Sequence, residues 1–566
     1  MQRPWTLVLL SAAATIATAA VAQPEHRPPP ADTVILNAKV WTANPRTPSA
    51  EAITVRGEHF VYVGDNATAS LFIGDDTTVI DAGGARILPG LTDAHIHLGN
   101  AAELLGSLSL RDATSREDFL ARLRDHANTL GPDEWVIGGR WSAESWPDTR
   151  HPTPEEIDEA TGGRRAALVR MDGHMLIAGR AALLAAGITR DGPEDPPGGR
   201  IGRTPDGEPY GAIYEEAMAL IRDLIPQRSD ESLRALMLRA QRELNAYGVT
   251  QVGAIETRRT LERVLAPMDD DGELTLRVHA SVSEQLAEPL EWQAMFRWCF
   301  ENRQMSPNVR VIGFKGYMDG SLGARTAWQF EPYLDDPHDH DNAGMPLSLA
   351  ERGDLMHIIL GGAQMSLQPI VHAIGERANA TILDWFANIP ASTRQRVRPR
   401  VEHAQHVRAQ DLPRFAELGV IASMQPLHKA DDGRYAAQRL SEERLQTSYA
   451  FRTLIDTGAV LAFGSDWPVV SPNPFLGIHA AVTSRTLDGE IFVPEQAITV
   501  EEALRAYTRG ASFAVHYNHE TATIAPGFFA DYVVLDRDVL EIPHDEIKNV
   551  RVVKTVLAGQ TVHEAP

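Results

Sequence analysis

"RILPGLTDAHIHL", residues 86–98, is the stretch from which the fold can be predicted. It is a largely apolar run that ends with His95 and His97, one residue apart. Because side chains alternate along a β-strand, these two histidines would lie on the same side of it. Two imidazoles directed at one point indicate a metal site, but a catalytic metal needs more protein ligands than two. The question is whether the rest of the chain supplies them.

Further apolar, β-rich runs follow along the chain at 248–255, 274–282, 310–321, 367–375, 398–405, 419–426 and 460–468. Helical patterns lie between most of them, as in 229–247, where apolar residues recur three and four positions apart. Eight strands with intervening helices predict an α/β fold of the (β/α)8 TIM-barrel type. In that fold the functional residues gather at the C-terminal ends of the strands.

The two ends of the chain differ from the middle. Residues 32–86 and 523–566 alternate apolar and polar side chains between turn residues, which is typical of antiparallel strands. They predict one small β-sandwich, built from both chain ends, with a barrel domain over 87–520. About 150 residues separate the first two barrel strands, far more than an ordinary connection. This predicts an inserted subdomain over about 101–230 that covers the barrel mouth.

The first residues of the chain have the features of a secretory signal peptide. Residues 1–22 hold an arginine, an apolar stretch and the small-residue ending Ala20-Val21-Ala22, and a polar, proline-rich segment follows. We therefore expect a protein exported to the periplasm or the medium, without stable membrane insertion after cleavage; an uncleaved anchor is the alternative. Cys299 is the single cysteine, so an intramolecular disulfide is excluded.

The balance of charge limits the partners. The 566-residue chain carries a formal net charge of −23, whereas nucleic acids and anionic membranes are bound by basic surfaces. We therefore expect a small-molecule substrate and no nucleic acid. Homo-oligomerisation is left open.

Metal-ligating side chains stand at the predicted strand ends: His95 and His97 on the first, Lys315 on the fourth, His372 on the fifth, His403 on the sixth and Asp466 on the eighth. A single histidine on an apolar run is usually a hydrogen-bonded core residue, but six such residues at one barrel mouth favour a Zn²⁺ or similar site. An ammonium group has no lone pair to offer a metal. Lys315 would fit as a carbamate formed with CO2; otherwise it would be an ion-pair partner.

These motifs together resemble the amidohydrolase superfamily, and more closely its amidohydrolase 3 branch, which includes N-substituted formamide deformylase-like enzymes. The resemblance covers essentially everything after the signal. It rests on "LPGLTDAHIHL", "GFKGYMDGSLGARTA", "VHAIGERA", "RVEHAQ", "MQPLH", "FGSDWPV" and "APGFFADYVVLD".

The resemblance implies a role for each ligand. His95 and His97 would bind the more buried metal together with Asp466. Lys315, as a carbamate, would bridge to a second metal held by His372 and His403; an unmodified Lys315 would leave a site with one metal. One or two Zn²⁺ ions, or other divalent metals, would thus serve as cofactor.

The implied reaction is hydrolysis of an amide-type C–N bond by metal-activated hydroxide, with Asp466 as the proton shuttle. An esterase or lactonase on the same centre, a deaminase with one metal, and a metal-containing binding protein without turnover are the alternatives. For substrate binding we predict His174, Asp319 and Arg325, although internal ion pairs of the 315–325 loop are the competing explanation for the last two.

Overall fold

The eight apolar runs form a parallel β-barrel in the computed structural model, which describes residues 27–144, 146–284, 286, 288–336 and 339–566. Within this described part, neighbouring barrel strands pair in parallel in chain order. The strands are β8 (Leu91–Ile96), β15 (Val249–Glu256), β16 (Arg277–Val282), β18 (Val309–Tyr317), β19 (Gln368–Ala373), β20 (Arg400–His403), β21 (Ile421–Met424) and β22 (Leu461–Phe463). The predicted TIM barrel is confirmed.

The first and last strands meet directly beside the predicted site. The backbone N–H of Asp466 donates to the carbonyl oxygen of His95 at 2.7 Å, and that of His97 donates to Trp467 at 2.9 Å. A Cβ on Gly464 would lie 2.5 Å from the backbone nitrogen of His95, so only glycine lets the two segments approach this closely. The closure of the barrel therefore places the end of β8 against the segment that carries Asp466.

Alternation along the strands separates packing residues from polar ones. Phe314 of β18 packs outward against Trp292 and Phe296 of α10 (Pro289–Glu301), so the next residue, Lys315, faces the other side of the strand. The outward residues join one large apolar core with the surrounding helices. These include α7 (Asp230–Ala246), α12 (Asp354–Gln364), α13 (Glu376–Ala387), α15 (Leu412–Leu418), α19 (Phe451–Asp456) and α21 (Val500–Arg505).

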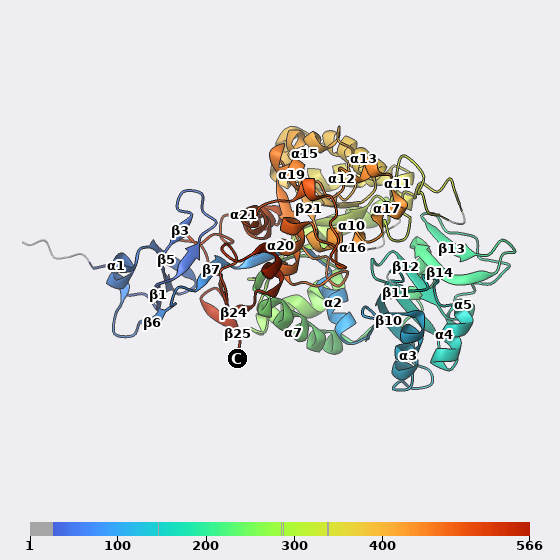
Figure 1. The fold of residues 1–566 in the computed structure, drawn as a ribbon, viewed down its shortest axis with the longest axis horizontal. Coiled ribbons are helices and arrows are strands. Elements are labelled where there is room, and N and C mark those ends of the chain that lie inside the picture. Colours follow the sequence, from blue (N-terminus) through green and yellow to red (C-terminus); the bar gives the residue numbers. More distant parts are fainter. Residues whose placement is uncertain (1–26, 145, 285, 287, 337–338) are drawn as a thin grey trace, which may run out of the picture.

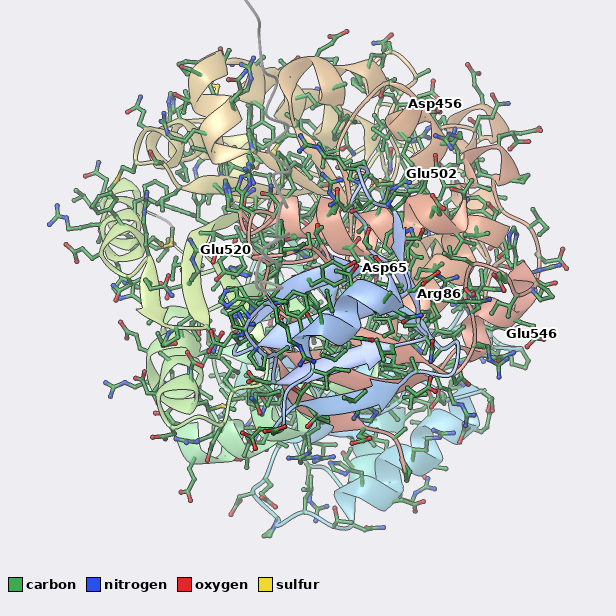
Figure 2. All side chains as sticks on the ribbon, turned by 90° about the vertical axis from the view of Figure 1, so that its left-hand side faces the viewer. Asp65, Arg86, Asp456, Glu502, Glu520 and Glu546 are labelled. Carbon is green, nitrogen blue, oxygen red and sulfur yellow. The ribbon has the colours of Figure 1, made fainter. Side chains whose placement is uncertain are left out.

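The chain ends form two further sheets that enclose a separate core. One is β5-β4-β1-β6, from His59–Gly64, Ala52–Arg56, Thr33–Leu36 and Thr78–Asp81. The other is β25-β24-β23-β7-β2-β3, from Gln560–Glu564, Val552–Leu557, Tyr532–Leu535, Arg86–Pro89, Lys39–Trp41 and Ser49–Ala50. Ile35 and Ile53 of the first sheet share a core with Ile87 and Val556 of the second, which confirms the sandwich built from both ends. Figure 2 views this end of the molecule, with Arg86 labelled.

The stretch 86–98 divides between two sheets. Its first part, β7, pairs with β2 and β23 in the sandwich, and its second part, β8, begins the barrel. Gly90 separates them, and a Cβ at that position would lie 2.3 Å from Oγ1 of Thr250. The absence of a side chain at Gly90 thus allows the chain to pass closely against the barrel strand that carries Thr250.

A third sheet comes from the insertion between β8 and β15. Its order is β13-β14-β12-β11-β10-β9, from Gly199–Arg203, Pro209–Glu215, Met175–Ala178, Ala166–Arg170, Val136–Trp141 and Leu108–Ser109. Apolar cores cover both faces, under α3 (Arg116–Ala127) and α4 (Pro154–Thr161) on one and α5 (Arg180–Ala185) on the other. The inserted sheet and the sandwich lie at opposite ends of the long axis, with the barrel between them (Figure 1).

The predicted signal, residues 1–22, lies outside the described residues. Among the residues that are described, helices long and apolar enough to cross a bilayer are absent.

Candidate metal centre

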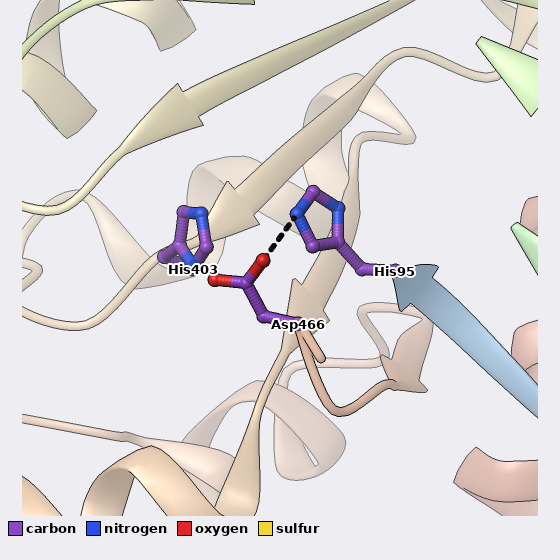
Figure 3. A group of neighbouring side chains, drawn as sticks. All are labelled: His95, His403 and Asp466. Atoms are coloured by element: carbon purple, nitrogen blue, oxygen red, sulfur yellow. Dashed lines mark ion pairs between the residues drawn. The ribbon is translucent and has the colours of Figure 1, made fainter. Parts of the chain in front are cut away.

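Three of the predicted ligands converge at the barrel mouth from strands that are far apart in the sequence. His95 is the next-to-last residue of β8, His403 ends β20, and Asp466 follows β22 (Figure 3). One ligand atom from each lies within 4.8 Å of the others, and all three side chains are buried. Imidazole nitrogens and a carboxylate oxygen at this separation are a donor set suited to Zn²⁺.

The carboxylate of Asp466 lies between His95 and His97. Its Oδ1 is 3.3 Å from Nε2 of His95 and 3.3 Å from Nε2 of His97. Among the described residues, neither Asp466 Oδ1 nor His95 Nε2 has a hydrogen-bond partner. Buried polar atoms are rarely left without a partner, so these unpaired atoms fit a cation bound between them.

Lys315 is the fourth convergent group. Its side chain is 2% exposed, and in the described structure its Nζ has no hydrogen-bond partner. Burial lowers the pKa of Lys315 to about 8, against the raising effects of Glu402 and Asp466. A larger share of the amine is therefore neutral, which is the form that reacts with CO2.

In three of the four predicted histidine ligands, one ring nitrogen faces a neighbouring oxygen. Oε2 of Glu402 lies 2.7 Å from Nδ1 of His95, and Oε1 of Gln425 lies 2.9 Å from Nδ1 of His403. In His372 the held nitrogen is Nε2, 3.0 Å from the carbonyl oxygen of Gly320. The oxygens of Gln425 and Gly320 can only accept, so Nδ1 of His403 and Nε2 of His372 donate to them, and the ion pair with Glu402 favours a proton on Nδ1 of His95. The nitrogens left for a metal are Nε2 of His95, Nε2 of His403 and Nδ1 of His372.

Burial also keeps these imidazoles in the form that a metal requires. Desolvation holds the pKa values of His372 and His403 well below 6.5, so both are neutral at neutral pH. For Asp466 burial acts in the opposite direction, but His95 and His97 outweigh it and hold the pKa well below its usual range. His95 differs, because Glu402 and Asp466 outweigh the lowering effects of burial and Lys315 and raise its pKa above the ordinary value. The centre therefore presents neutral nitrogens from His372 and His403 and an ionised carboxylate, whereas a metal at His95 would displace a proton.

Glu402 is a site residue that the sequence reading did not single out. Its carboxylate joins His95 to the guanidinium of Arg400, whose Nε donates to Oε1 at 2.7 Å. The signal was present in strand alternation: Val401 packs in the outer core, so Glu402 had to face the interior. His403 then reaches the site because the backbone turns at φ 75°, followed by φ 43° at Ala404. Strained backbone of this kind is concentrated at functional sites.

The pocket above the centre is shared between the barrel and the insertion. Its lining includes His372, His403, Gln405, His428 and Asp466 from the barrel, and Arg170, Met171, Asp172 and His174 from the insertion. The predicted substrate residue His174 thus lies at the pocket, with its ring centre 5.0 Å from that of His372.

His174 is held in place by a buried glutamate. Nδ1 of His174 lies 2.8 Å from Oε2 of Glu215, the last residue of β14. The other oxygen of Glu215 accepts from the hydroxyl of Thr326 at 2.5 Å, which ties the insertion to the loop after β18. Burial lowers the pKa of His174, but the charge and the hydrogen bond of Glu215 act in the opposite direction. The net result is a pKa raised to about 9. His174 is therefore a cationic donor at the pocket wall.

The other two predicted substrate residues lie elsewhere. Asp319 is fully buried and accepts the backbone N–H groups of Trp328, Ile374 and Gly375 at 2.8–3.0 Å, which joins the loops after β18 and β19. Arg325 forms a two-point ion pair with Asp335, at 3.1 and 2.7 Å, outside the described pocket lining. In this structure both residues stabilise loops.

Comparison with known proteins agrees with this geometry. A family model described as "Amidohydrolase family" matches residues 78–563. The chain is 32% identical to Protein LONG AFTER FAR-RED 3 of Arabidopsis thaliana, over 89% of this chain and 87% of that protein. It is 25% identical to N-substituted formamide deformylase of Arthrobacter pascens, over 94% and 98%. A solved structure of an uncharacterized metal-dependent hydrolase from Pyrococcus horikoshii superposes with a TM-score of 0.72 at 26% identity, over 91% and 99%.

Proposed function

The chain belongs to the amidohydrolase family, and within the metal-dependent hydrolases of that family we propose that it cleaves an amide-type C–N bond of a small molecule. The observation that carries the proposal is the convergence of His95, His403 and Asp466. Among the described residues, Nε2 of His95, Oδ1 of Asp466 and Nζ of Lys315 are buried without a hydrogen-bond partner. The similarity to a formamide deformylase over nearly the whole of both chains favours an N-acyl substrate.

The ligands divide into two groups around Lys315. His95, His97 and Asp466 would hold one divalent ion, and His372 and His403 a second. Zn²⁺ is the ion that fits this nitrogen and oxygen set best. When bound, such ions lower the pKa of water and polarise the scissile carbonyl group.

We propose further that Lys315 carries a carbamate. The neutral amine attacks the carbon of CO2: a C–N bond forms, one C=O π bond opens to an anionic oxygen, and the nitrogen releases one proton to water, which gives a carbamate with a carboxylate-like end. The new group would replace a buried, unpaired nitrogen with two oxygens able to contact both ions.

Asp466 has the position and charge to move the proton. Its ionised carboxylate, kept so by His95 and His97, accepts a proton from the attacking water. The new C–O bond forms in that attack. Asp466 then returns the proton to the leaving nitrogen as the C–N bond breaks. His174, fixed by Glu215, presents an N–H from the facing wall toward the carbonyl end of the substrate.

A turnover screen with paired variants tests the function. The zinc-reconstituted protein is assayed with N-formyl amines, N-acyl amino acids, cyclic amides, esters and lactones. We expect amide hydrolysis that falls by about 10²- to 10⁴-fold in Asp466→Ala. Asp411→Ala removes another buried, ion-paired aspartate away from the pocket and should retain activity. Absence of turnover in the metal-loaded protein would contradict the proposal and favour a binding protein.

We propose that residues 1–22 direct export and are removed. Expression in a secreting bacterium should yield a mature protein that begins at Gln23, as read by N-terminal sequencing. A cell-associated protein that retains Met1 would contradict export.

A further inference from the structure

Gln405 places an unused acceptor in the wall of the pocket. The residue follows His403 by two positions, is 3% exposed, and contributes to the pocket lining. Its Nε2 lies 3.4 Å from Nδ1 of His428, whereas its Oε1 has no hydrogen-bond partner within the described chain. A buried carbonyl oxygen without a donor is costly in free energy, so such an atom in a pocket indicates a donor on the ligand.

The neighbouring groups determine which end of the Gln405 amide is left without a partner in the pocket lining. Nε2 of His428 lies 3.9 Å from Oδ2 of Asp466, so the carboxylate favours the tautomer with its hydrogen on Nε2. Nδ1 of His428 then has a lone pair and accepts from the NH₂ group of Gln405. The His428 ring is itself fixed, parallel to His403 within 7° at a centroid distance of 6.0 Å. The oxygen of Gln405 is therefore the end that remains free.

The substrate of the proposed reaction has one donor at its reacting bond. A secondary amide carries an N–H on the scissile nitrogen, whereas an ester has an oxygen with only lone pairs at that position. A tertiary amide has a carbon substituent in place of the hydrogen. An acceptor in the wall of a pocket that also contains Asp466 can distinguish these three linkages.

We propose that Oε1 of Gln405 accepts the N–H of the scissile amide and selects amides that carry this hydrogen over esters and tertiary amides. This inference rests on the proposed amide hydrolysis and specifies its substrate class. Holding the N–H on the Gln405 side leaves the nitrogen lone pair free to face Asp466. The proton that Asp466 took from water then passes to that nitrogen as the C–N bond breaks. Gln405 is a specificity residue that contacts the substrate and does not itself transfer a proton.

Three matched substrates isolate the linkage. They share one acyl group, which is attached to benzylamine, N-methylbenzylamine or benzyl alcohol. We expect the wild-type enzyme to have a kcat/KM for the secondary amide that exceeds those for the tertiary amide and the ester, after each is divided by its uncatalysed rate. This comparison needs no variant. Equal ratios for the three substrates would overturn the inference.

Gln405→Met removes the acceptor while keeping an unbranched side chain of similar length. We expect kcat/KM for the secondary amide to fall by about 10- to 100-fold, with the ester and the tertiary amide changed by less than about threefold. Metal content should stay at the wild-type level. Gln241→Met, which alters a buried glutamine of α7 that bonds Glu273 and Thr275, is the matched control and should leave all three rates unchanged.

Two outcomes would overturn the inference in distinguishable ways. An equal loss on all three substrates in Gln405→Met would show that Gln405 only supports His428 and His403. Failure of the wild-type enzyme on every amide, with or without an N–H, would refute the proposed function itself, and the inference with it.

Discussion

Replacing Glu402 with glutamine should weaken metal binding from outside the ligand set. The carboxylate of Glu402 serves two buried donors at once, Nδ1 of His95 at 2.7 Å and the guanidinium of Arg400 at 2.7 Å. A glutamine side chain has one oxygen and one NH₂ group, so it can accept from one of these donors while its NH₂ group opposes the other. Either His95 loses its orientation or Arg400 loses its charge partner.

The size of both effects follows from the burial of this group. Glu402 is fully buried and Arg400 is 1% exposed, so water cannot replace the lost carboxylate. Leaving a buried cation without its partner costs about 3–5 kcal/mol of stability. Loss of the residue that orients a metal-binding histidine typically lowers metal affinity by about 10- to 100-fold. The two costs can be measured separately.

The assay uses a control that carries the stability cost alone. Asp531→Asn breaks another buried arginine–carboxylate pair, Arg277 Nε to Asp531 Oδ2 at 3.1 Å, on the barrel strand β16 but away from the pocket lining. Zn²⁺ affinity is measured by competition with a chromophoric chelator, and thermal unfolding is followed on the metal-free proteins. Both variants should melt below wild type, but only Glu402→Gln should lose metal affinity. Wild-type zinc affinity in a folded Glu402→Gln protein would refute the orienting role.

Other variants and conditions test the remaining parts of the structure. His95→Ala should lose bound metal and activity together, measured by elemental analysis and turnover; full metal content with full activity would refute the ligand assignment. The native, metal-loaded protein should be heavier than its acid-treated form by the mass of one CO2 in addition to that of the released metal, and Lys315→Met should abolish the CO2 part of the difference; two bound metals with a bare amine would contradict the carbamate. Burial lowers the pKa of Lys429 to about 7 in the folded protein, against about 10.5 in the unfolded chain. Between these two pH values the unfolded chain binds one proton more than the folded protein. The free energy of unfolding should therefore rise with pH by up to about 1.4 kcal/mol per pH unit from this group. Lys429→Met should reduce that rise in thermal or denaturant unfolding from pH 7 to 10, and an unchanged pH dependence would show that Lys429 is charged in the folded protein.

Local pattern was sufficient to predict most of the fold. Each barrel strand is a short apolar run bounded by a change of periodicity, and parallel strands buried on both faces leave such runs in the sequence. The helix over 229–247 was predicted from its spacing, and the structure has α7 at Asp230–Ala246. The division of 86–98 between two sheets was not predicted, because Gly90 matters only through its distance from Thr250, a residue far along the chain.

The chemistry of the site was predicted from residue type and strand position. His95, Asp466 and His403 could be proposed because the C-terminal ends of barrel strands must converge, whatever the loops do. Glu402 was within reach of the same argument, through its alternation with Val401. The direction of the His403 side chain was not predictable in this way. Strand alternation would place it on the opposite face from Glu402, and only the left-handed backbone at His403 and Ala404 brings both side chains toward the centre.

Only the tertiary structure decided the roles of the polar residues around the proposed metal ligands. Asp319, Arg325 and His174 are equally suited by residue type to contact a substrate. Asp319 is instead saturated by backbone N–H groups and Arg325 by Asp335, while His174 faces the pocket. Candidate metal ligands can be predicted from residue type and strand position, both of which can be read from the sequence alone. Whether a polar atom is satisfied or free depends on partners that are distant in the chain, and so the free oxygen of Gln405 could be found only in the folded protein.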